Sequence, residues 1–215
     1  IYRMDHARLD RSRVMGPTRA PVVIGVTGAS GHLLARLIVD QLLDYGYPVL
    51  AVATGAGQRV WREELDVDFT SSILSWQGRG SVTTYPLGDI GAPIASGGLH
   101  TAGMIVVPCS MGTLSGIVTG AAGNLIERAA DVTLKECRTL TLVPRETPFN
   151  AIHLENMLKL ARIGVRIVPP LPAFYLKPAT MEEAMRHLVP RVLAVHGIPE
   201  AQGEPSAYVP ATGSF

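Results

Sequence analysis

The feature of this sequence that most constrains its fold is an alternation of short β-branched runs with longer helical patterns. The runs predict buried strands at residues 22–26, 49–53, 104–107, 139–143 and 165–168. Between them, apolar residues recur with a period near 3.6, which is typical of amphipathic helices. Strands that alternate with helices form a parallel sheet covered on both faces. The sequence therefore predicts an α/β fold with a single doubly wound parallel sheet, Rossmann-like or flavodoxin-like.

The helical patterns and the chain ends define the expected domain organisation. Helices are predicted at residues 33–45, 58–64, 114–119, 124–130 and 180–196. A further helix is expected to begin with Thr147 as its cap and Pro148 at its first position, and to run to about residue 163. One domain is expected at 21–198, with a flexible N-terminal arm at 1–20 and a proline-containing C-terminal arm at 199–215.

Charge and cysteine content exclude several classes of protein. The 19 basic and 18 acidic residues give a net charge of +1, so we expect no nucleic acid partner. Cys109 and Cys137 are too few for a disulfide framework and the six histidines lack zinc spacing, which predicts a cytoplasmic protein without a metal site. Residues 90–126 carry no charged side chain, yet their glycines and prolines indicate short buried elements and loops, and we expect no membrane helix.

Small and hydroxyl residues follow three of the predicted strands, at residues 27–31, 54–57 and 109–113. The carboxyl ends of parallel strands meet at one edge of the sheet, where exposed amides and helix N-termini bind phosphate. The first turn, TGASG, lacks the full GxGxxG pattern, and no acidic residue follows the second strand to hold a ribose. These residues favour a mononucleotide, most commonly FMN, over a dinucleotide; tight backbone packing is the alternative explanation for each turn.

Several cationic and phenolic side chains are candidates for binding a second anion. Arg145 and Glu146 directly follow the fourth predicted strand, so they can face the same crevice. Further candidates are Arg128, Lys135, Arg191 and Tyr175. Their spacing alone does not bring them together. Solvated helix faces would equally explain the three cations, and a proline corner would explain the tyrosine.

Seven motifs, in this order along the chain, resemble those of the flavin prenyltransferases, often called UbiX-like proteins. The resemblance covers about residues 22–198. The motifs are VTGASG (26–31), PIASGG (93–98), PCSMGTLSGIVTGA (108–121), NLIERAADVTLKE (124–136), LVPRETP (142–148), HLENMLKL (153–160) and PPLPAFY (169–175).

The resemblance implies a reaction, a cofactor and partners. Proteins of this family transfer a dimethylallyl group from dimethylallyl monophosphate, or a close relative of it, to reduced FMN. Alkylation at flavin N5 is followed by ring closure at C6, and the resulting prenylated FMN serves UbiD-type decarboxylases. Family members typically assemble as homododecamers built from trimers. The donor's chain length and its mono- or diphosphate form stay open.

The resemblance also implies roles for individual residues. FMN contacts fall on Gly28, Ala29, Ser30, Thr54, Ser110, Met111, Gly112, Thr113 and Arg145. The prenyl phosphate would be bound by Arg128, Lys135, Glu146, Tyr175 and Arg191, some of them reaching across subunits. Ser30 and Glu64 match positions linked to proton handling, so the implied catalytic set is Ser30, Glu64, Lys135 and Glu146.

These side chains suit the chemistry. Arg, Lys and Tyr donors stabilise a departing allylic phosphate without a metal. Departing phosphate, Glu146 or Ser30 could accept the proton lost on ring closure. Trp61 or Trp76 could cover the allyl cation, with ordinary core packing as the alternative.

Three positions depart from the family pattern. Gly55 replaces a frequent lysine and Gly98 a frequent hydroxyl residue, which leaves the flavin-phosphate affinity and the donor preference open. Cys137 stands in place of an arginine, and we expect a small buried residue there rather than a nucleophile.

Two other functions remain as alternatives. An FMN-dependent oxidative cysteine decarboxylase would need a histidine near the flavin, for which His32 and His100 are available, but the expected asparagine-containing clamp is absent. A non-catalytic FMN-binding regulatory subunit is the second alternative.

Overall fold

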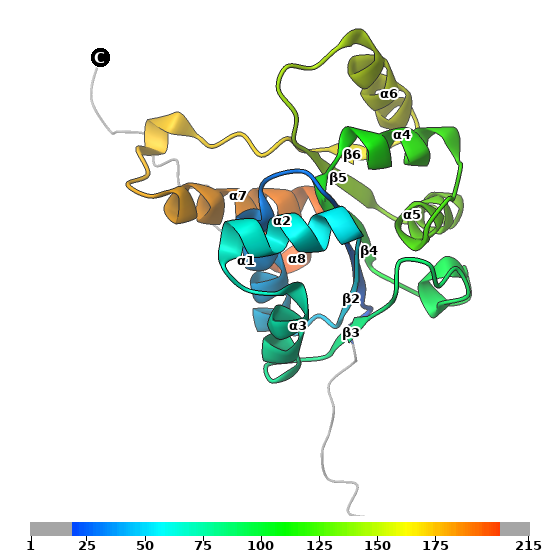
Figure 1. The fold of residues 1–215 in the computed structure, drawn as a ribbon, viewed down its shortest axis with the longest axis horizontal. Helices are drawn as coiled ribbons and strands as arrows, with labels where there is room; N and C mark the ends of the chain where they lie inside the picture. The colour runs from blue at the N-terminus through cyan, green and yellow to red at the C-terminus, as the bar shows by residue number, and fades with distance from the viewer. Residues whose placement is uncertain (1–18, 203–215) are drawn as a thin grey trace, which may run out of the picture.

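The computed structural model describes residues 19–202, which form a three-layer α/β arrangement (Figure 1). Within them a six-stranded parallel sheet has the order β3-β2-β1-β4-β5-β6. The strands are β1 (Val22–Val26), β2 (Val49–Ala53), β3 (Val82–Thr84), β4 (Gly103–Cys109), β5 (Leu140–Pro144) and β6 (Arg166–Ile167). This confirms the predicted doubly wound sheet, and the strand order is the Rossmann one. The order reverses between β1 and β4, which places the ligand crevice beyond the carboxyl ends of these two strands.

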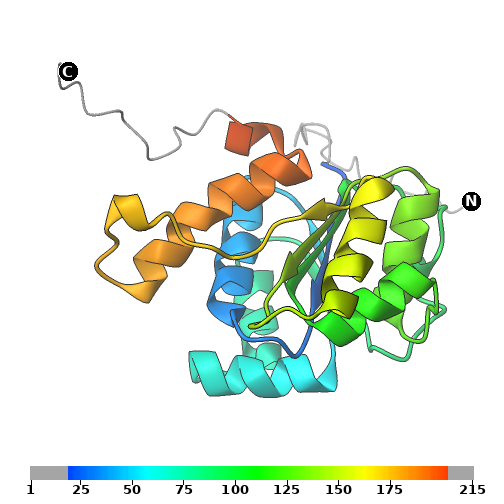
Figure 2. The same ribbon diagram turned by 90° about the horizontal axis from the view of Figure 1, so that it is seen from above.

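Helices cover both faces of the sheet, as Figure 2 shows from above. One face carries α1 (His32–Asp44), α2 (Gly55–Leu65), α3 (Phe69–Gln77), α7 (Met181–His196) and α8 (Pro199–Gln202). The other carries α4 (Met111–Thr119), α5 (Leu125–Lys135) and α6 (Ala151–Arg162).

Two separate hydrophobic cores result, one on each side of the sheet. Neighbouring strand residues alternate between them: Ile24 and Ile105 join the core with α1 and α7, whereas Val23 and Met104 join the core with α4 and α5. Because both faces are covered, the central strands β1, β2, β4 and β5 are almost continuously hydrophobic, which is why the sequence pattern located them.

The helix predicted from Pro148 begins at Ala151 instead. The Asn150 side chain accepts a hydrogen bond from the backbone of His153, and the His153 ring accepts one from the backbone of Asn150. This reciprocal capping box fixes the start of the helix. The expected cap, Thr147, donates its hydroxyl to the carbonyl of Glu146.

Besides the short helix α8, one strand and one helix were missing from the sequence prediction. The edge strand β3 has only three residues, two of them exposed threonines, and the nine-residue helix α3 carries serine, threonine and glutamine among its apolar residues. Neither presents a strong hydrophobic period.

Toward the C-terminus the packed domain extends beyond residue 198. Residues Pro199–Gln202 form α8, where Ala201 is buried and Glu200 pairs with Arg19. The remaining residues of both predicted arms, 1–18 and 203–215, lie outside the described part of the chain.

The long uncharged stretch at 90–126 folds as predicted into short elements. It contains a 3-10 turn η1 (Pro93–Ala95), all of β4 and all of α4. No helix between residues 19 and 202 has both the length and the apolar character needed to cross a bilayer. Near the other end of the chain, the segment after β6 holds a second 3-10 turn, η2 (Phe174–Leu176), and extends away from the sheet (Figure 2).

Candidate functional site

Thr27 links the two strand ends at the point where the sheet order reverses. Its hydroxyl donates to the carbonyl of Pro108 at 2.8 Å and accepts the amide of Ser110, also at 2.8 Å. The ends of β2 and β5 attach to the same edge, because the Thr54 amide donates to Val26 and the Arg145 amide to Cys109. The structure therefore brings the three predicted turns together and adds Arg145 to them.

The first turns of α2 and α4 are open toward this edge. Thr54 and Ser110 cap these helices by accepting the amides of Gly57 and Thr113. A side-chain carbon added at Gly55 or Gly112 would meet no atom within 4 Å. The amides that lack a partner among the described residues are those of Gly55, Ala56, Met111 and Gly112. Four such donors at two helix N-termini fit the phosphate of a mononucleotide.

The N-terminus of α1 is already occupied by a carboxylate of the chain itself. Glu64, from α2, accepts the amides of Gly31 at 3.0 Å and His32 at 2.8 Å, and also a hydrogen bond from the Ser30 side chain. Burial would raise the pKa of Glu64, but these hydrogen bonds outweigh it and lower the pKa below its usual range. Ser30 and Glu64 thus lie together. The dipole of α1 is already compensated by Glu64, so a bound phosphate depends on α2 and α4.

A cavity of about 480 Å³ opens beyond the carboxyl end of β5. Arg145 and Glu146 provide its charged groups, and the Glu146 carboxylate accepts the amide of Thr147 at 2.9 Å. The other lining residues are mostly apolar: Pro144, Thr147, Pro148, Phe149, Pro169, Pro170 and Leu171. An apolar wall with one cation and one carboxylate fits an amphiphilic anion such as a prenyl phosphate.

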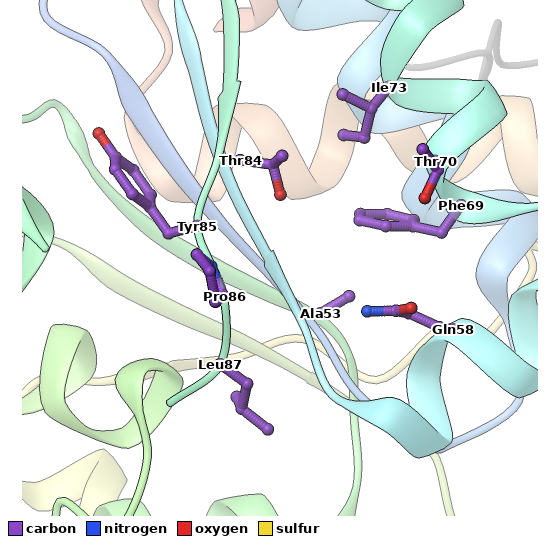
Figure 3. A pocket seen from close by; sticks show the side chains of 9 residues that line it. All are labelled: Ala53, Gln58, Phe69, Thr70, Ile73, Thr84, Tyr85, Pro86 and Leu87. Carbon is purple, nitrogen blue, oxygen red and sulfur yellow. The ribbon is translucent and has the colours of Figure 1, made fainter. Parts of the chain in front are cut away.

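A second cavity, of about 340 Å³, lies between α2, α3 and the segment after β3. Figure 3 shows Phe69, Gln58 and Ala53 around this space, while the Tyr85 ring points away from it. No charged residue lines it. Sequence reasoning did not find this cavity, because it is bounded by α3 and β3, the two elements that the hydrophobic pattern missed.

The other predicted anion-binding residues are divided between elements on the two sides of the sheet. Arg128 pairs with Asp131 on α5 at 2.7 Å, and Lys135 pairs with the neighbouring Glu136. Tyr175 and Arg191 are exposed, on η2 and α7. Both views place α5 and the segment that holds η2 on opposite sides of the sheet (Figures 1 and 2).

Within its own chain, Lys135 also lies at the end of the sheet opposite the crevice. It ends α5 only five residues before β5 begins at Leu140, and the adjacent Arg138 donates to the carbonyls of Gly97 and Leu99, shortly before β4. These are the amino ends of the strands, opposite Arg145.

For the two tryptophans the structure shows the core-packing alternative, and the expectation of a buried Cys137 is wrong. Trp61 and Trp76 are buried in an aromatic cluster with Phe69, because Trp61 donates its indole N–H to Ser72 and Trp76 donates to Asp40. Neither can cover the crevice. Cys137 is exposed rather than buried, since it follows the end of α5 in a left-handed conformation.

The other cysteine and the metal-ligand side chains complete the picture of the site. Cys109 is fully buried, and burial raises the pKa of its thiol to about 12, which makes it a poor nucleophile. Between residues 19 and 202, no three His, Cys, Asp or Glu side chains lie close enough together to hold a metal ion.

Comparisons with known proteins agree with this geometry. The family model described as Flavoprotein matches residues 11–192. A flavin prenyltransferase UbiX from Halalkalibacterium halodurans is 50% identical over 180 residues, which cover 81% of this chain and 87% of the relative.

Solved structures show the same relationship. The structure of AnUbiX (PadA1) in complex with FMN and dimethylallyl pyrophosphate is 37% identical, with a TM-score of 0.78, over 83% of this chain and 92% of that one. A dodecameric FMN-dependent UbiX-like decarboxylase from Escherichia coli O157:H7 is 40% identical, with a TM-score of 0.77, over 83% and 95% of the two chains. The cypemycin decarboxylase CypD, at 15% identity and a TM-score of 0.55, covering 77% of this chain and 89% of its own, shares the fold alone.

Proposed function

This chain belongs to the flavoprotein family and, within it, to the flavin prenyltransferases, and from that premise we propose how its residues carry out prenyl transfer to FMN. The proposal depends on one observation. The open backbone amides of α2 and α4, an uncharged cradle, lie at the same edge of the sheet as the apolar cavity that contains Arg145 and Glu146. The cradle suits the flavin phosphate and the cavity suits an isoprenoid phosphate.

FMN would bind along the strand ends where the order of the sheet reverses. The open amides of α2 and α4, with the hydroxyls of Thr54 and Ser110, would hold its phosphate. Arg145 would lie beside the ring system, and the remaining contacts would come from Gly28, Ala29, Ser30, Met111, Gly112 and Thr113. Reduced FMN supplies the nucleophilic nitrogen N5 and the ring carbon C6.

The prenyl donor would occupy the cavity beside Glu146. In the reaction the allylic carbon–oxygen bond would break, the phosphate would leave with the electron pair, and flavin N5 would form the carbon–nitrogen bond and lose its proton. Ring closure would then add a proton to the prenyl carbon–carbon double bond, join the resulting cation to C6 and release the C6 proton. Arg128, Lys135, Tyr175 and Arg191 would stabilise the charge that develops on the phosphate. Glu146, or Ser30 backed by Glu64, would take the proton released from C6.

The donors to this phosphate would come from more than one copy of the chain. Within one copy, α5, which ends at Lys135, and the segment with η2, which holds Tyr175, lie on opposite sides of the sheet. The large apolar side chains that are exposed on α6 and around η2 suit contacts between copies: Phe149, Ile152, Leu154, Leu158, Ile163, Leu171, Phe174 and Met181. The dodecameric relative supports an assembly of this kind, and we propose a homododecamer.

A direct test combines the protein with reduced FMN and dimethylallyl monophosphate, or the diphosphate, without added metal. We expect phosphate release in step with a gain of one C5 unit in the mass of the extracted flavin. Unchanged FMN with both donors would contradict prenyl transfer. Restored activity of a UbiD-type decarboxylase on addition of the product would test the proposed recipient.

The cysteine decarboxylase alternative lacks a positioned histidine. His32 is buried behind Glu64, and His100 lies three residues before β4, at the amino ends of the strands. The regulatory alternative predicts FMN binding without turnover, which the same assay detects. A cytoplasmic location stays a prediction from the two cysteines, both of which are free.

A further inference from the structure

His32 is a buried histidine whose ring nitrogens have no hydrogen-bond partner among the described residues. It is the first residue of α1, and its side chain is fully shielded from solvent. Its Nδ1 lies 3.4 Å from the carboxylate oxygen Oε2 of Glu64, and its ring contacts the buried Trp61 edge to face, with 5.7 Å between the centroids.

Packing does not account for a histidine at this position. A buried polar group without a hydrogen bond destabilises the folded state, whereas a phenylalanine would fill the same space against Trp61 without that cost. The feature that distinguishes His32 from an apolar ring is the N–H that Nδ1 can direct toward Glu64. This points to a role for the nitrogen rather than for the ring.

The side chains of Ser30 and His32 both lie beside the Glu64 carboxylate. Ser30 lies in the turn after β1 and donates to Glu64, whose carboxylate also receives the backbone amide of His32 at 2.8 Å. The His32 ring nitrogen Nδ1 faces the same carboxylate oxygen, Oε2, that accepts this amide. We propose that His32 is a positioning residue: its neutral ring directs the Nδ1–H at the Glu64 carboxylate across 3.4 Å, and this polar contact favours the orientation and the ionised state of the carboxylate that Ser30 needs.

The charges around His32 are consistent with this arrangement. Burial lowers the pKa of His32, and the opposing effects of the Glu64 charge and the Thr27 backbone do not restore it, so the ring is neutral at neutral pH. A neutral ring still donates one N–H. Helix α7 and strand β4 also pack against α1, yet within the described residues Glu64 is the charged side chain that acts on the pKa of His32.

The inference rests on the proposed role of Ser30 and Glu64 in handling the flavin proton. A Glu64 carboxylate that loses the His32 donor would take up a proton more easily, since hydrogen bonds to the anion hold its pKa down. It would also turn more freely about its side-chain bonds. Both changes weaken Ser30 as a proton acceptor without touching the prenyl phosphate.

Two variants separate the nitrogen from the ring. His32→Phe keeps the contact with Trp61 and removes the donor, whereas His32→Asn keeps a donor and removes the ring. Infrared difference titration of the FMN-loaded protein measures the pKa of Glu64 directly, and the Glu64→Gln variant identifies its carboxylate band. This readout does not depend on turnover.

We expect His32→Phe to raise the pKa of Glu64 by about one unit, the lower end of what a hydrogen bond to a charged group contributes. The acidic limb of the kcat profile should move by the same amount, with KM for the prenyl donor unchanged and a melting temperature no lower than that of the wild type. His32→Asn should restore the pKa of Glu64 while lowering the melting temperature.

An unchanged pKa of Glu64 in His32→Phe would overturn the inference. A pKa of Glu64 in His32→Asn as high as that in His32→Phe would overturn it as well. If His32→Phe does not fold, His32→Met provides the same comparison, because methionine also fills the space without an N–H donor. A wild-type protein without prenyl transfer would instead count against the proposed function, while the titration of Glu64 still decides the role of His32.

Discussion

A mixture of two inactive variants should recover activity if Lys135 and Tyr175 serve one site from different copies of the chain. In a single chain the elements that carry these residues, α5 and the segment with η2, lie on opposite sides of the sheet. Lys135 ends α5 near the amino ends of the strands, away from Arg145 and Glu146. Lys135→Ala and Tyr175→Phe each remove one donor to the departing phosphate. Each change alone should lower kcat by about 10²–10³-fold, as the removal of one transition-state donor typically does.

The recovery has a definite size. In an assembly of equal numbers of both variants, the copy that provides Lys135 carries the native lysine in half of the sites, and the copy that provides Tyr175 carries the native tyrosine in half. If the two copies are independent, about one quarter of the sites hold both native residues. The mixture should therefore reach about one quarter of wild-type phosphate release, far above either variant alone.

The assay needs hybrid assemblies, obtained by coexpression with two different affinity tags and verified by native mass spectrometry. A mixture of Lys135→Ala with the Lys135→Ala/Tyr175→Phe double variant is the matched control, because no copy in it carries Lys135. Hybrid assemblies that stay at the background of the single variants would refute the idea that the site is shared between copies. Single variants with full activity would refute the roles of the two side chains.

Three further changes test the framework that carries the site. Thr27→Val leaves the Ser110 amide and the Pro108 carbonyl without their partner, so we expect a loss of about 1–3 kcal/mol in a denaturant titration and weaker FMN binding in a fluorescence titration. Gly103→Ala should lower the melting temperature, because φ is +121° there and the new carbon would lie 2.5 Å from the Thr139 carbonyl oxygen. Gly88→Ala is the control: its new carbon would meet no atom within 4 Å, so the melting temperature should not change. Burial lowers the pKa of His196 to about 4. As the pH falls from 6.5 toward 4, the unfolded chain therefore binds a proton that the folded chain does not, and the free energy of unfolding should fall by about 3 kcal/mol across that window. Calorimetry at pH 7 and pH 5 should show a smaller decline for His196→Gln.

The fold and the strand ends were accessible from the sequence because both depend on local pattern. Val22–Val26 and Val49–Ala53 are continuous apolar runs followed by small residues, and the structure places both strands within the predicted bounds. The start of α6 was predicted wrongly because a histidine at position 153 takes the capping role that glutamate or glutamine usually fills. Such a substitution is visible only in the hydrogen bonds.

The composition of the site was less accessible than the fold. Nothing in the spacing of Trp61 distinguishes a ring that covers a ligand from one that packs on Phe69 and Trp76, and the structure shows the second arrangement. Lys135 was assigned through family resemblance, but the helical pattern carries no information about which copy of the chain it serves. That information lies in the apolar surfaces that stay exposed when a single chain folds.

Those exposed apolar surfaces are concentrated in the stretch of chain that also lines the cavity with Arg145 and Glu146. Apart from Leu74 and Ile90, every large apolar side chain that is exposed in the described part of the chain falls between residues 149 and 181. This stretch also contributes Phe149, Pro169, Pro170 and Leu171 to the wall of the cavity with Arg145 and Glu146. Association through this stretch would bury apolar surface and close the cavity at the same time, and an allylic cation survives only where water is excluded. The same contacts would therefore stabilise the assembly and protect the reaction.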